Sequence, residues 1–378
     1  MTRMRLLNAK SKKLELIPNC ERPPYAIVSH RWGADSDEVL FTNFDNMPSP
    51  LARIKVMRNK KVAGACSQAL RDGYKHLWLD TCCIDRENQT ELTASLNSMY
   101  RWYQESAVCY VYLRDVSDIS QITESEWFRR GWTLQELIAP RVVRFFSKDW
   151  KLLATREGLI QKIGNHTGID SRVLQSHGTI PNHVTIAQRM RWATGRNTKE
   201  EEDTAYSLMG LFDRVHLHAI YGIKEEAFMK LQYEIMSKSS DQSLFAWVGE
   251  VGITRFLAAS PSHYLNVYEI PCEEFYSQFP PSRLSRWPWF SPTNGAVRLC
   301  LPIRQIEDHS TSVYEALLRC SLDPPQPLPQ HQRPLVVRLR YDNTRFRFIR
   351  VHGQTSISPL KDNSVASFTL QEVLVDEV

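Results

Sequence analysis

The feature that most constrains the fold is an alternation of short apolar runs with helical patterns over residues 1–150. Four apolar runs occur, at residues 25–29 (YAIVS), 76–80 (HLWLD), 108–113 (VCYVYL) and 142–146 (VVRFF). They are rich in β-branched and aromatic residues and nearly apolar throughout, which is typical of strands buried on both faces. Between them, apolar side chains at helical spacing predict helices over 62–70, 92–103 and 126–138. We therefore predict an α/β fold with a doubly wound parallel sheet.

The rest of the chain has two further patterns. Residues 151–247 are predicted to be mostly helical, with capping-box spacing at Thr185/Gln188 and at Thr198/Glu201. Residues 324–334 form a proline-rich spacer that should be extended. After it, residues 335–341 and 345–351 alternate apolar and basic around a turn, which predicts a β-hairpin. We therefore predict three parts: an α/β domain over 1–150, its helical extension over 151–247 and a smaller β-rich part over 248–378.

The amino-acid composition restricts the kinds of molecule that we expect the protein to bind. The 378 residues include 47 basic and 42 acidic side chains, and a net charge of +5 is too small to predict nucleic-acid binding. Arginines of the hairpin could form a basic face, although a solvated sheet face is the favoured interpretation; they are Arg338, Arg340, Arg345, Arg347 and Arg350. No stretch approaches the ~20 apolar residues that span a bilayer, and the N-terminus lacks a signal-peptide pattern. We therefore expect a cytoplasmic protein. Its eight cysteines form no CxxC pair, so we expect no metal site. The chain is too large to need a disulfide framework, so we expect reduced cysteines.

Polar side chains gather where the predicted strands end, which is where parallel sheets bind ligands. Residues 29–32 (SHRW) follow the first strand, and Asp80 ends the second. The segment 125–140 reads SEWFRRGWTLQELIAP, and helical spacing would put Phe128, Trp132 and Glu136 on one face, away from the side that packs on the sheet. A carboxylate beside an indole can be partly desolvated, which raises its pKa. Spacing alone nevertheless favours an ordinary solvated glutamate.

Three long motifs resemble a known family. Residues 25–33 (YAIVSHRWG), 76–113 and 127–140 (WFRRGWTLQELIAP) are similar, in order, to the motifs of the fungal heterokaryon-incompatibility (HET) domain. Residues 193–212 and two later segments also resemble the regions after these motifs in HET proteins, so the similarity extends over about 1–247. HET domains are in turn similar to TIR domains, and the resemblance therefore implies a TIR-like, flavodoxin-like sheet.

The resemblance also implies an activity. TIR enzymes cleave NAD at the nicotinamide–ribose bond with one glutamate in a W-x-x-x-E-L helix, and Trp132 to Leu137 match that pattern, with Thr133 where plant members have cysteine. Glu136 is then the catalytic carboxylate. Ser29-His30-Arg31 matches the turn after the first strand, with His30 in place of the usual Phe or Tyr. One carboxylate suffices for this chemistry, because nicotinamide leaves as a neutral molecule and only the oxocarbenium-like ribose needs stabilising.

The same resemblance suggests binding roles, each with a structural alternative. Trp32 and Trp132 could stack on a base, whereas Trp132 could equally belong to the core. Arg31 could pair with the pyrophosphate of NAD or with Asp35 or Asp37. Asp80 could contact substrate or cap a turn. The hydroxyl of Ser29 could serve the site or bond locally to backbone.

We expect an NAD-cleaving effector that triggers programmed cell death in heterokaryon incompatibility or fungal innate immunity. NAD or a related nucleotide would be the substrate and not a cofactor, since no GxxxxGK[ST] or GxGxxG motif is present. TIR enzymes commonly act only when assembled, so we expect a homo-oligomer on activation. The alternative is a non-enzymatic TIR-like scaffold that signals by homotypic assembly, and a weaker one is a nucleotide sensor without turnover. The sequence leaves open NAD against NADP, hydrolysis against cyclisation, and a sensor domain in a longer chain.

Overall fold

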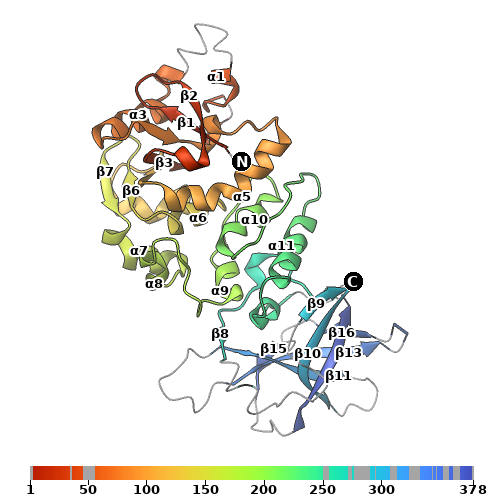
Figure 1. Cartoon of the computed structure of the whole chain (residues 1–378). Coiled ribbons are helices and arrows are strands. Elements are labelled where there is room, and N and C mark those ends of the chain that lie inside the picture. The colour runs from red at the N-terminus through yellow and green to blue at the C-terminus, as the bar shows by residue number, and fades with distance from the viewer. Residues whose placement is uncertain are drawn as a thin grey trace. The chain divides into compact units, whose positions relative to one another are not determined.

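The computed structural model contains two compact units, and each is formed from three separate segments of the chain (Figure 1). Unit 1 comprises Met1–Pro181, Gly195–Leu211 and His216–Tyr221, and unit 2 comprises Asn182–Thr194, Phe212–Val215 and Gly222–Val378. The structure describes residues 3–34, 36–45, 56–249, 255–270, 275, 290–293, 295–306, 313–322, 333–342, 344–345, 347–351, 357–360 and 367–376. Within these described residues, each unit has a seven-stranded sheet of its own.

The sheet of unit 1 has the strand order β2-β1-β4-β3-β5-β6-β7. The strands are β1 Arg3–Asn8, β2 Leu14–Pro18, β3 Tyr25–His30, β4 His76–Trp78, β5 Val108–Tyr112, β6 Val143–Phe146 and β7 Leu152–Thr155. The four central strands, β4-β3-β5-β6, are parallel, whereas β1, β2 and β7 pair antiparallel at the two edges. The four predicted parallel strands are confirmed, and the antiparallel edges were not predicted.

Burial explains the parallel centre of the sheet. Every residue of β3 and of β5 is buried, so each strand contributes apolar side chains to both faces. The register pairs Ile27 of β3 with Trp78 of β4 on one side and with Cys109 of β5 on the other. Each large apolar side chain buried here contributes about 1.5–3 kcal/mol to folding.

Helices with side-chain caps connect the parallel strands. α3 (Lys60–Arg71) begins after Asn59, whose side chain accepts a hydrogen bond from the amide of Val62. α5 (Gln89–Glu105) begins after Asn88 in the same way, with the Asn88 side chain accepting a hydrogen bond from the amide of Glu91. The short helices α1 (Thr42–Asp45) and α4 (Asp80–Cys83) lie in the connections after β3 and β4.

The predicted single helix over 126–138 is wrong. The chain forms a 3-10 turn, η3 (Glu126–Arg129), then an extended residue at Arg130, and then the α-helix α6 (Thr133–Ile138). The break arises because the backbone at Arg130 and Gly131 pairs with Asn197: the amide of Gly131 donates to the carbonyl of Asn197 over 2.9 Å. Phe128 and Glu136 therefore do not share one helical stripe.

Shorter helices complete unit 1. They are α7 (Ile160–Thr167), α8 (Ser171–Gln175), α10 (Asp203–Tyr206), and the 3-10 turns η1 (Asn19–Glu21), η2 (Ile119–Glu124), η4 (Glu157–Leu159) and η5 (Met209–Leu211). The predicted capping box at Thr198/Glu201 is wrong, because α10 begins only at Asp203 and the Thr198 hydroxyl instead lies 3.2 Å from that of Thr204.

Unit 2 combines a small helical part with a β-sheet. Its helices are α9 (Ile186–Arg191) and α11 (Glu226–Met236), and its 3-10 turns are η6 (Gln242–Phe245) and η7 (Pro261–His263). Its strands are β8 Tyr268–Glu269, β9 Phe290–Thr293, β10 Ala296–Ile306, β11 Val313–Leu318, β12 Cys320–Ser321, β13 Leu335–Asp342, β14 Arg347–Arg350, β15 Ile357–Pro359 and β16 Thr369–Asp376. The path β11-β10-β16-β14-β13 closes like a barrel, because β11 also pairs with β13.

Two local predictions in unit 2 are confirmed, and the alternative of a basic face on the hairpin is not supported. Thr185 and Gln188 form the predicted capping box, and β13 and β14 form the predicted hairpin. The hairpin arginines do not form one basic face, because Arg350 is buried and donates to the carbonyl of Phe245 over 2.9 Å. Most of the predicted spacer, residues 324–332, lies outside the described residues.

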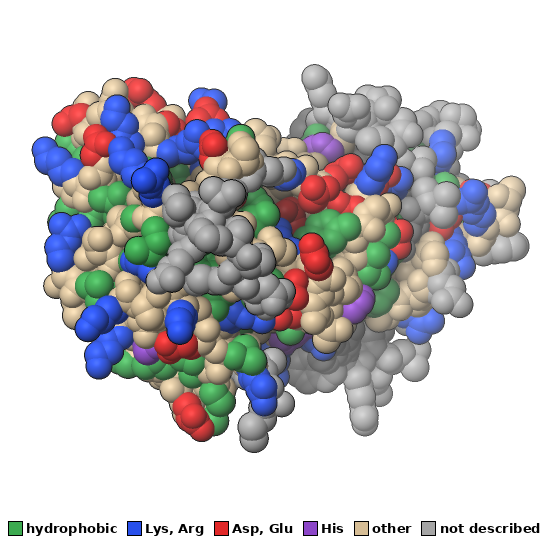
Figure 2. All heavy atoms as spheres, turned by 90° about the horizontal axis from the view of Figure 1, so that it is seen from above, with side chains coloured by type: hydrophobic (Ala, Val, Ile, Leu, Met, Phe, Trp, Pro, Cys, Tyr) green, Lys and Arg blue, Asp and Glu red, His purple; other side chains and the backbone are tan. Residues whose placement is uncertain are grey.

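Within the described residues, no helix is both long and apolar enough to cross a membrane. The positively charged side chains on the surface are also separated into groups. On the described part of the face seen in Figure 2, Lys and Arg side chains occur in separate groups, with uncharged side chains between them. The described part of this face therefore shows no continuous basic surface of the kind that follows a nucleic-acid backbone.

Candidate functional site

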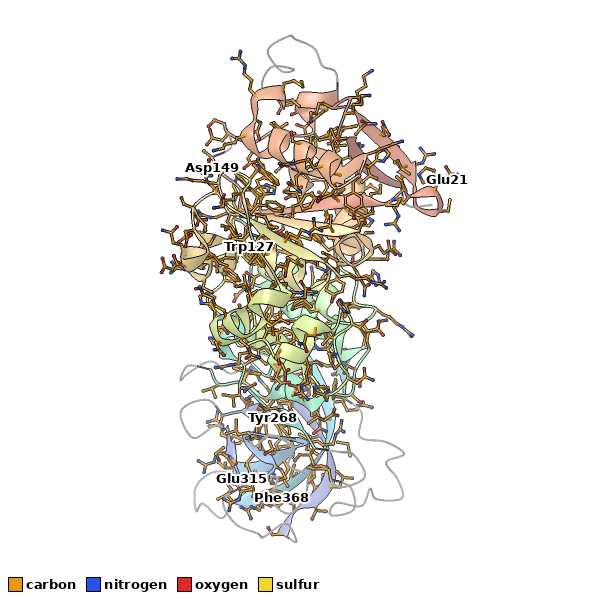
Figure 3. The ribbon with its side chains drawn as sticks, turned by 90° about the vertical axis from the view of Figure 1, so that its left-hand side faces the viewer. Glu21, Trp127, Asp149, Tyr268, Glu315 and Phe368 are labelled. Carbon is orange, nitrogen blue, oxygen red and sulfur yellow. The ribbon has the colours of Figure 1, made fainter. Side chains whose placement is uncertain are left out.

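The side chain of Glu136 is buried inside unit 1, where a chain of hydrogen bonds holds it. Glu136 lies on α6 and is only 5% exposed. A short hydrogen bond joins the hydroxyl of Ser29, in β3, to its carboxyl group. The indole N–H of Trp127 in turn donates to the Ser29 hydroxyl over 2.8 Å. Trp127 itself lies in the interior of unit 1, whereas Asp149 lies at its surface (Figure 3).

Burial changes the charge of Glu136. It raises the pKa of the carboxyl group to about 8, and the negative charge of Asp80 acts in the same direction. The hydrogen bonds from Ser29 and Tyr103 and the charge of Arg130 oppose this rise without cancelling it. In these surroundings Glu136 is therefore mostly protonated at neutral pH. A cation placed beside it would favour the ionised form.

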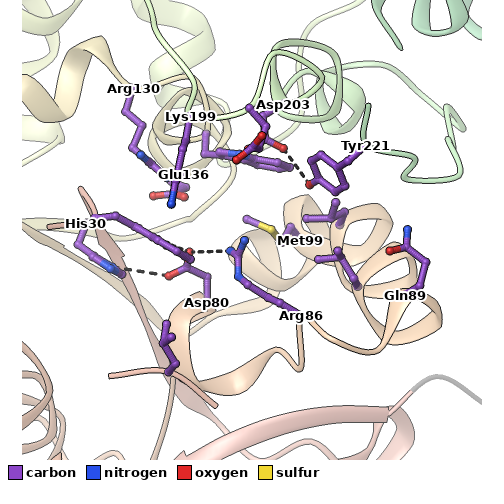
Figure 4. Close-up of a pocket in the computed structure, with 16 residues that line it drawn as sticks. His30, Asp80, Arg86, Gln89, Met99, Arg130, Glu136, Lys199, Asp203 and Tyr221 are labelled. Carbon is purple, nitrogen blue, oxygen red and sulfur yellow. Dashed lines mark hydrogen bonds and ion pairs between the residues drawn. The ribbon is translucent and has the colours of Figure 1, made fainter. Parts of the chain in front are cut away.

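A pocket of about 440 Å³ opens in front of Glu136 (Figure 4). All its lining residues belong to unit 1. Besides Glu136 they comprise three basic residues, three further acidic residues, three large aromatic residues, His30 and a few apolar or amide side chains. The charged and aromatic ones are Arg86, Arg130, Lys199, Asp80, Glu200, Asp203, Trp32, Trp132 and Tyr221. Such a pocket is large enough for a small organic molecule and offers both stacking surfaces and anion-binding groups.

Asp80 organises one side of the pocket. It is the first residue of α4, directly beyond β4, and its carboxylate accepts a hydrogen bond from the indole N–H of Trp32 over 2.7 Å. Arg86 Nη2 lies 3.7 Å from the same carboxylate, and its guanidinium stacks over the Trp32 ring at 4.2 Å. Asp80 therefore fixes the positions of both Trp32 and Arg86.

His30, at the end of β3, is buried and uncharged. Burial lowers the pKa of its imidazole well below the ordinary value, and the positive charge of Lys61 lowers it further. Nδ1 lies 3.8 Å from the Asp80 carboxylate, and Nε2 lies 3.9 Å from Glu38 with no hydrogen-bond partner among the described residues. A neutral imidazole can shape the pocket but adds no positive charge to it.

The opposite side of the pocket comes from segments that follow residue 195. The hydroxyl of Tyr221 donates to Asp203 over 3.0 Å, and the side chain of Trp132 also hydrogen-bonds to Asp203. Burial raises the pKa of the Asp203 carboxyl above its usual value. These contacts fix the Trp132 ring, which is 8% exposed and lines the pocket.

The structure places most of the predicted site residues together. His30, Trp32, Asp80, Trp132 and Glu136 all line the pocket. Ser29 is fully buried behind it, and its hydroxyl contacts the Glu136 carboxyl and the Trp127 indole.

Arg31 lies elsewhere. Its side chain is 46% exposed, it forms an ion pair with Glu126 at 3.8 Å, and it is not among the residues that line the pocket. The side chain after a buried strand residue points to the opposite face, so His30 and Arg31 cannot both enter one pocket from an extended backbone.

The sequence did not single out several residues that line the pocket. They are Arg86, Arg130, Lys199, Glu200, Asp203 and Tyr221. Arg86 and Arg130 lie inside the motifs at 76–113 and 127–140, so position within a motif was a usable signal. Lys199, Glu200 and Asp203 lie inside the later segment 193–212 that also resembles HET proteins, but only the fold shows that residues beyond 195 return to the sheet.

The Cys82 thiol, close to the site, is poorly reactive. Cys82 and Cys83 are buried, and the pKa of the Cys82 thiol is raised well above its usual value by its contact with Cys83 and by burial. Such a thiol is a poor nucleophile. Among the described residues, no group of His, Cys, Asp or Glu side chains has an arrangement that could hold a metal ion.

A comparison with known proteins finds a family match in the region that contains many of the residues lining this pocket. Residues 25–120 match the family described as heterokaryon incompatibility protein (HET). This stretch is therefore similar to HET domains. The chain is also 44% identical over 231 residues to "Vegetative incompatibility protein HET-E-1" of Podospora anserina. That match covers 58% of this chain but only 16% of the relative's length. No solved structure matches the chain.

The HET match does not contain the whole pocket. It includes Ser29, His30, Asp80 and Arg86 but ends before α6, which carries Glu136. The candidate site is therefore formed jointly by residues inside the matched region and by segments later in the chain.

Proposed function

We propose that the Glu136 pocket binds NAD or a related nucleotide and cleaves its nicotinamide–ribose bond, and that this cleavage triggers cell death in heterokaryon incompatibility. The observation that carries the proposal is a buried carboxyl group, tied to Ser29, that faces a pocket with three basic and three aromatic side chains. The order of the parallel strands, β4-β3-β5-β6, is also compatible with a TIR-like, flavodoxin-like sheet.

The proposed reaction needs one carboxylate and one water molecule. The bond between C1′ of the ribose and the nicotinamide nitrogen breaks, and its electron pair leaves with nicotinamide, which becomes neutral. The positive charge then lies on the ribose ring, where the Glu136 carboxylate stabilises it. Water adds to C1′ and loses a proton to solvent, which yields ADP-ribose, nicotinamide and a proton.

The electrostatics of the pocket fit a cationic substrate. Glu136 by itself is mostly protonated at neutral pH because burial raises its pKa to about 8. The positively charged nicotinamide ring of NAD would lower that pKa, so that binding of the substrate produces the ionised carboxylate. Arg86 and Arg130 would face the pyrophosphate, and Trp32 offers a ring for stacking.

The test is nicotinamide release from NAD by the purified chain over a range of protein concentrations. Glu136→Gln should lower the rate by on the order of 10²-fold or more, since it removes the carboxylate that stabilises the ribose. Glu124→Gln is a matched control, because Glu124 is an exposed glutamate on the neighbouring turn η2, and it should leave the rate unchanged. A rate that rises more steeply than protein concentration would support assembly-dependent activity.

Two results would overturn the proposal. Release that persists in Glu136→Gln would assign catalysis to another residue. Intact NAD in the presence of demonstrably self-associated wild-type protein would favour a scaffold that signals by assembly.

A further inference from the structure

A second pocket in unit 1 lies apart from the site around Glu136. It has a volume of about 360 Å³, and its basic side chains outnumber its two acidic ones, Asp37 and Glu38. The basic residues are Arg31, Lys60, Lys61, Arg114 and Lys148. None of these five lines the Glu136 pocket.

Three of the basic residues follow three adjacent strands. Arg31 comes directly after β3, Arg114 comes two residues after β5, and Lys148 comes two residues after β6. β3, β5 and β6 are neighbours in the sheet and run parallel, so their carboxyl ends lie at the same edge. Because neighbouring strands are only about 4.7–4.9 Å apart, the sheet brings the three cations close together.

Three of the five basic side chains have an ion-pair partner within unit 1, and among the described residues two have none; Arg31 pairs with Glu126. Glu38 pairs with the buried Lys61, and Lys60 Nζ lies 2.6 Å from Asp149. Arg114 and Lys148 are exposed, and within the described residues neither side chain has an ion pair or hydrogen bond. Two cations at one sheet edge repel each other unless an anion lies between them.

Two backbone features add to the pocket. A Cβ at position 33 would lie 2.5 Å from Arg114 Nη1, so the glycine leaves room for this guanidinium across the loop after β3. The amide of Gly33 donates to Glu38 over 2.7 Å, which fixes that loop. α3, which has twelve residues, begins at the pocket, and its N-terminus contributes a partial positive charge.

We propose that this second pocket binds a compact polyphosphate anion, either free or as the phosphate chain of a nucleotide. Phosphate oxygens are the groups that clustered Arg and Lys side chains bind most strongly. The pocket is distinct from the one that we assign to NAD. Glu38 lines the second pocket and His30 lines the first, with 3.9 Å between Glu38 Oε2 and His30 Nε2, so these two side chains form part of the wall between them.

The test is isothermal titration calorimetry of the whole chain at low ionic strength, with tripolyphosphate and with ATP. The double variant Arg114→Gln/Lys148→Gln should bind tripolyphosphate at least about tenfold more weakly than wild type. The matched control is Arg71→Gln/Lys75→Gln. It removes two exposed cations, one at the opposite end of α3 and one just before β4, and it should bind like wild type. Thermal unfolding of both variants checks that they remain folded.

A further variant separates this proposal from the proposed function. Glu136→Gln should retain tripolyphosphate binding, whereas the proposed function requires it to lower the rate of NAD cleavage. The proposal is overturned if tripolyphosphate and ATP both fail to bind wild type, or if the two double variants lose affinity equally. It is also overturned if Arg86→Gln/Arg130→Gln removes tripolyphosphate binding while Arg114→Gln/Lys148→Gln does not, since the anion would then occupy the Glu136 pocket. Binding of ATP without tripolyphosphate would likewise show that a nucleoside, and not the phosphate chain, is recognised.

Discussion

Glu136 and His30 are buried ionisable residues whose pKa values move in opposite directions. Burial raises the pKa of Glu136 to about 8 and lowers that of His30 well below its ordinary value. In both cases burial favours the uncharged form. The pocket around Glu136 is therefore less charged than its residue types alone suggest.

This ionisation predicts a pH-dependent stability. Between pH 4.5 and 8 the unfolded chain ionises Glu136 while the folded chain keeps it protonated, so the native state loses stability as pH rises through this range. Glu136→Gln removes that loss. Each unit of difference between the folded and unfolded pKa corresponds to about 1.4 kcal/mol in the free energy of unfolding. We expect the variant to gain stability relative to wild type on going from about pH 5 to about pH 8, measured by denaturant unfolding at both values.

His30 also makes the stability depend on pH, but with the opposite sign. This dependence should be the same in wild type and in Glu136→Gln. Its depressed pKa means that stability falls as pH drops below the ordinary histidine value of 6.5, because only the unfolded chain takes up the proton. Both proteins keep His30, so its effect cancels in their difference. If the stability of wild type and of Glu136→Gln changed equally with pH, the Glu136 carboxyl group would have the same pKa in the folded and unfolded states.

Among the elements, α6 depends most on a distant side chain. It has only six residues, and a helix of this length is not stable by itself. Arg156, just after β7, is fully buried, and its guanidinium donates to the carbonyls of Leu137, Pro140 and Arg141 over 2.9–3.0 Å. These bonds satisfy the backbone at the end of α6 and thereby hold the helix that carries Glu136.

Arg156→Met should therefore destabilise unit 1 by about 2–4 kcal/mol, because it leaves buried carbonyls without donors. Arg144→Met is the matched control. Arg144 is about one third exposed and pairs with Asp72, so its loss should change stability by no more than about 1 kcal/mol. Denaturant midpoints measure both effects, and equal losses would argue against a special role for Arg156.

The elements also show what the sequence could predict. β3 and β5 were recognised because a strand buried on both faces is apolar throughout. The hairpin β1–β2 was missed because its apolar residues alternate with basic and acidic ones at the edge of the sheet. The break before α6 could not be predicted, since it results from pairing with Asn197, a residue far along the chain. Glu136 was identified from the resemblance of its motif, because helical spacing alone suggested the wrong surroundings.

At the scale of the whole molecule, the chain leaves unit 1 and returns to it twice. Gly195–Leu211 and His216–Tyr221 belong to unit 1 although residues of unit 2 precede and follow them. These returning segments supply Lys199, Asp203 and Tyr221 to the pocket. Gly210, in the first of them, packs so closely on α5 that a Cβ added to it would collide with the side chain of Tyr100.

Gly210→Ala should therefore push the returning segment away from α5. We expect a loss of about 1–3 kcal/mol, the usual effect of overfilling a packed site. Gly158→Ala is the matched control, because a Cβ at Gly158 would approach only the Thr155 hydroxyl, at 3.8 Å, and its effect should stay below about 1 kcal/mol. Thermal denaturation measures both, and equal tolerance of alanine would contradict the close packing.

The two returns of the chain also restrict how such a pocket can be inherited. An exchange of coding sequence that ended at residue 181 would transfer Glu136 without Lys199, Asp203 or Tyr221. The shortest continuous stretch that carries every residue of the pocket runs from His30 to Tyr221, and it necessarily includes pieces of unit 2. Recombination between genes could therefore transfer this site only together with segments of unit 2. The two units should for this reason be inherited together.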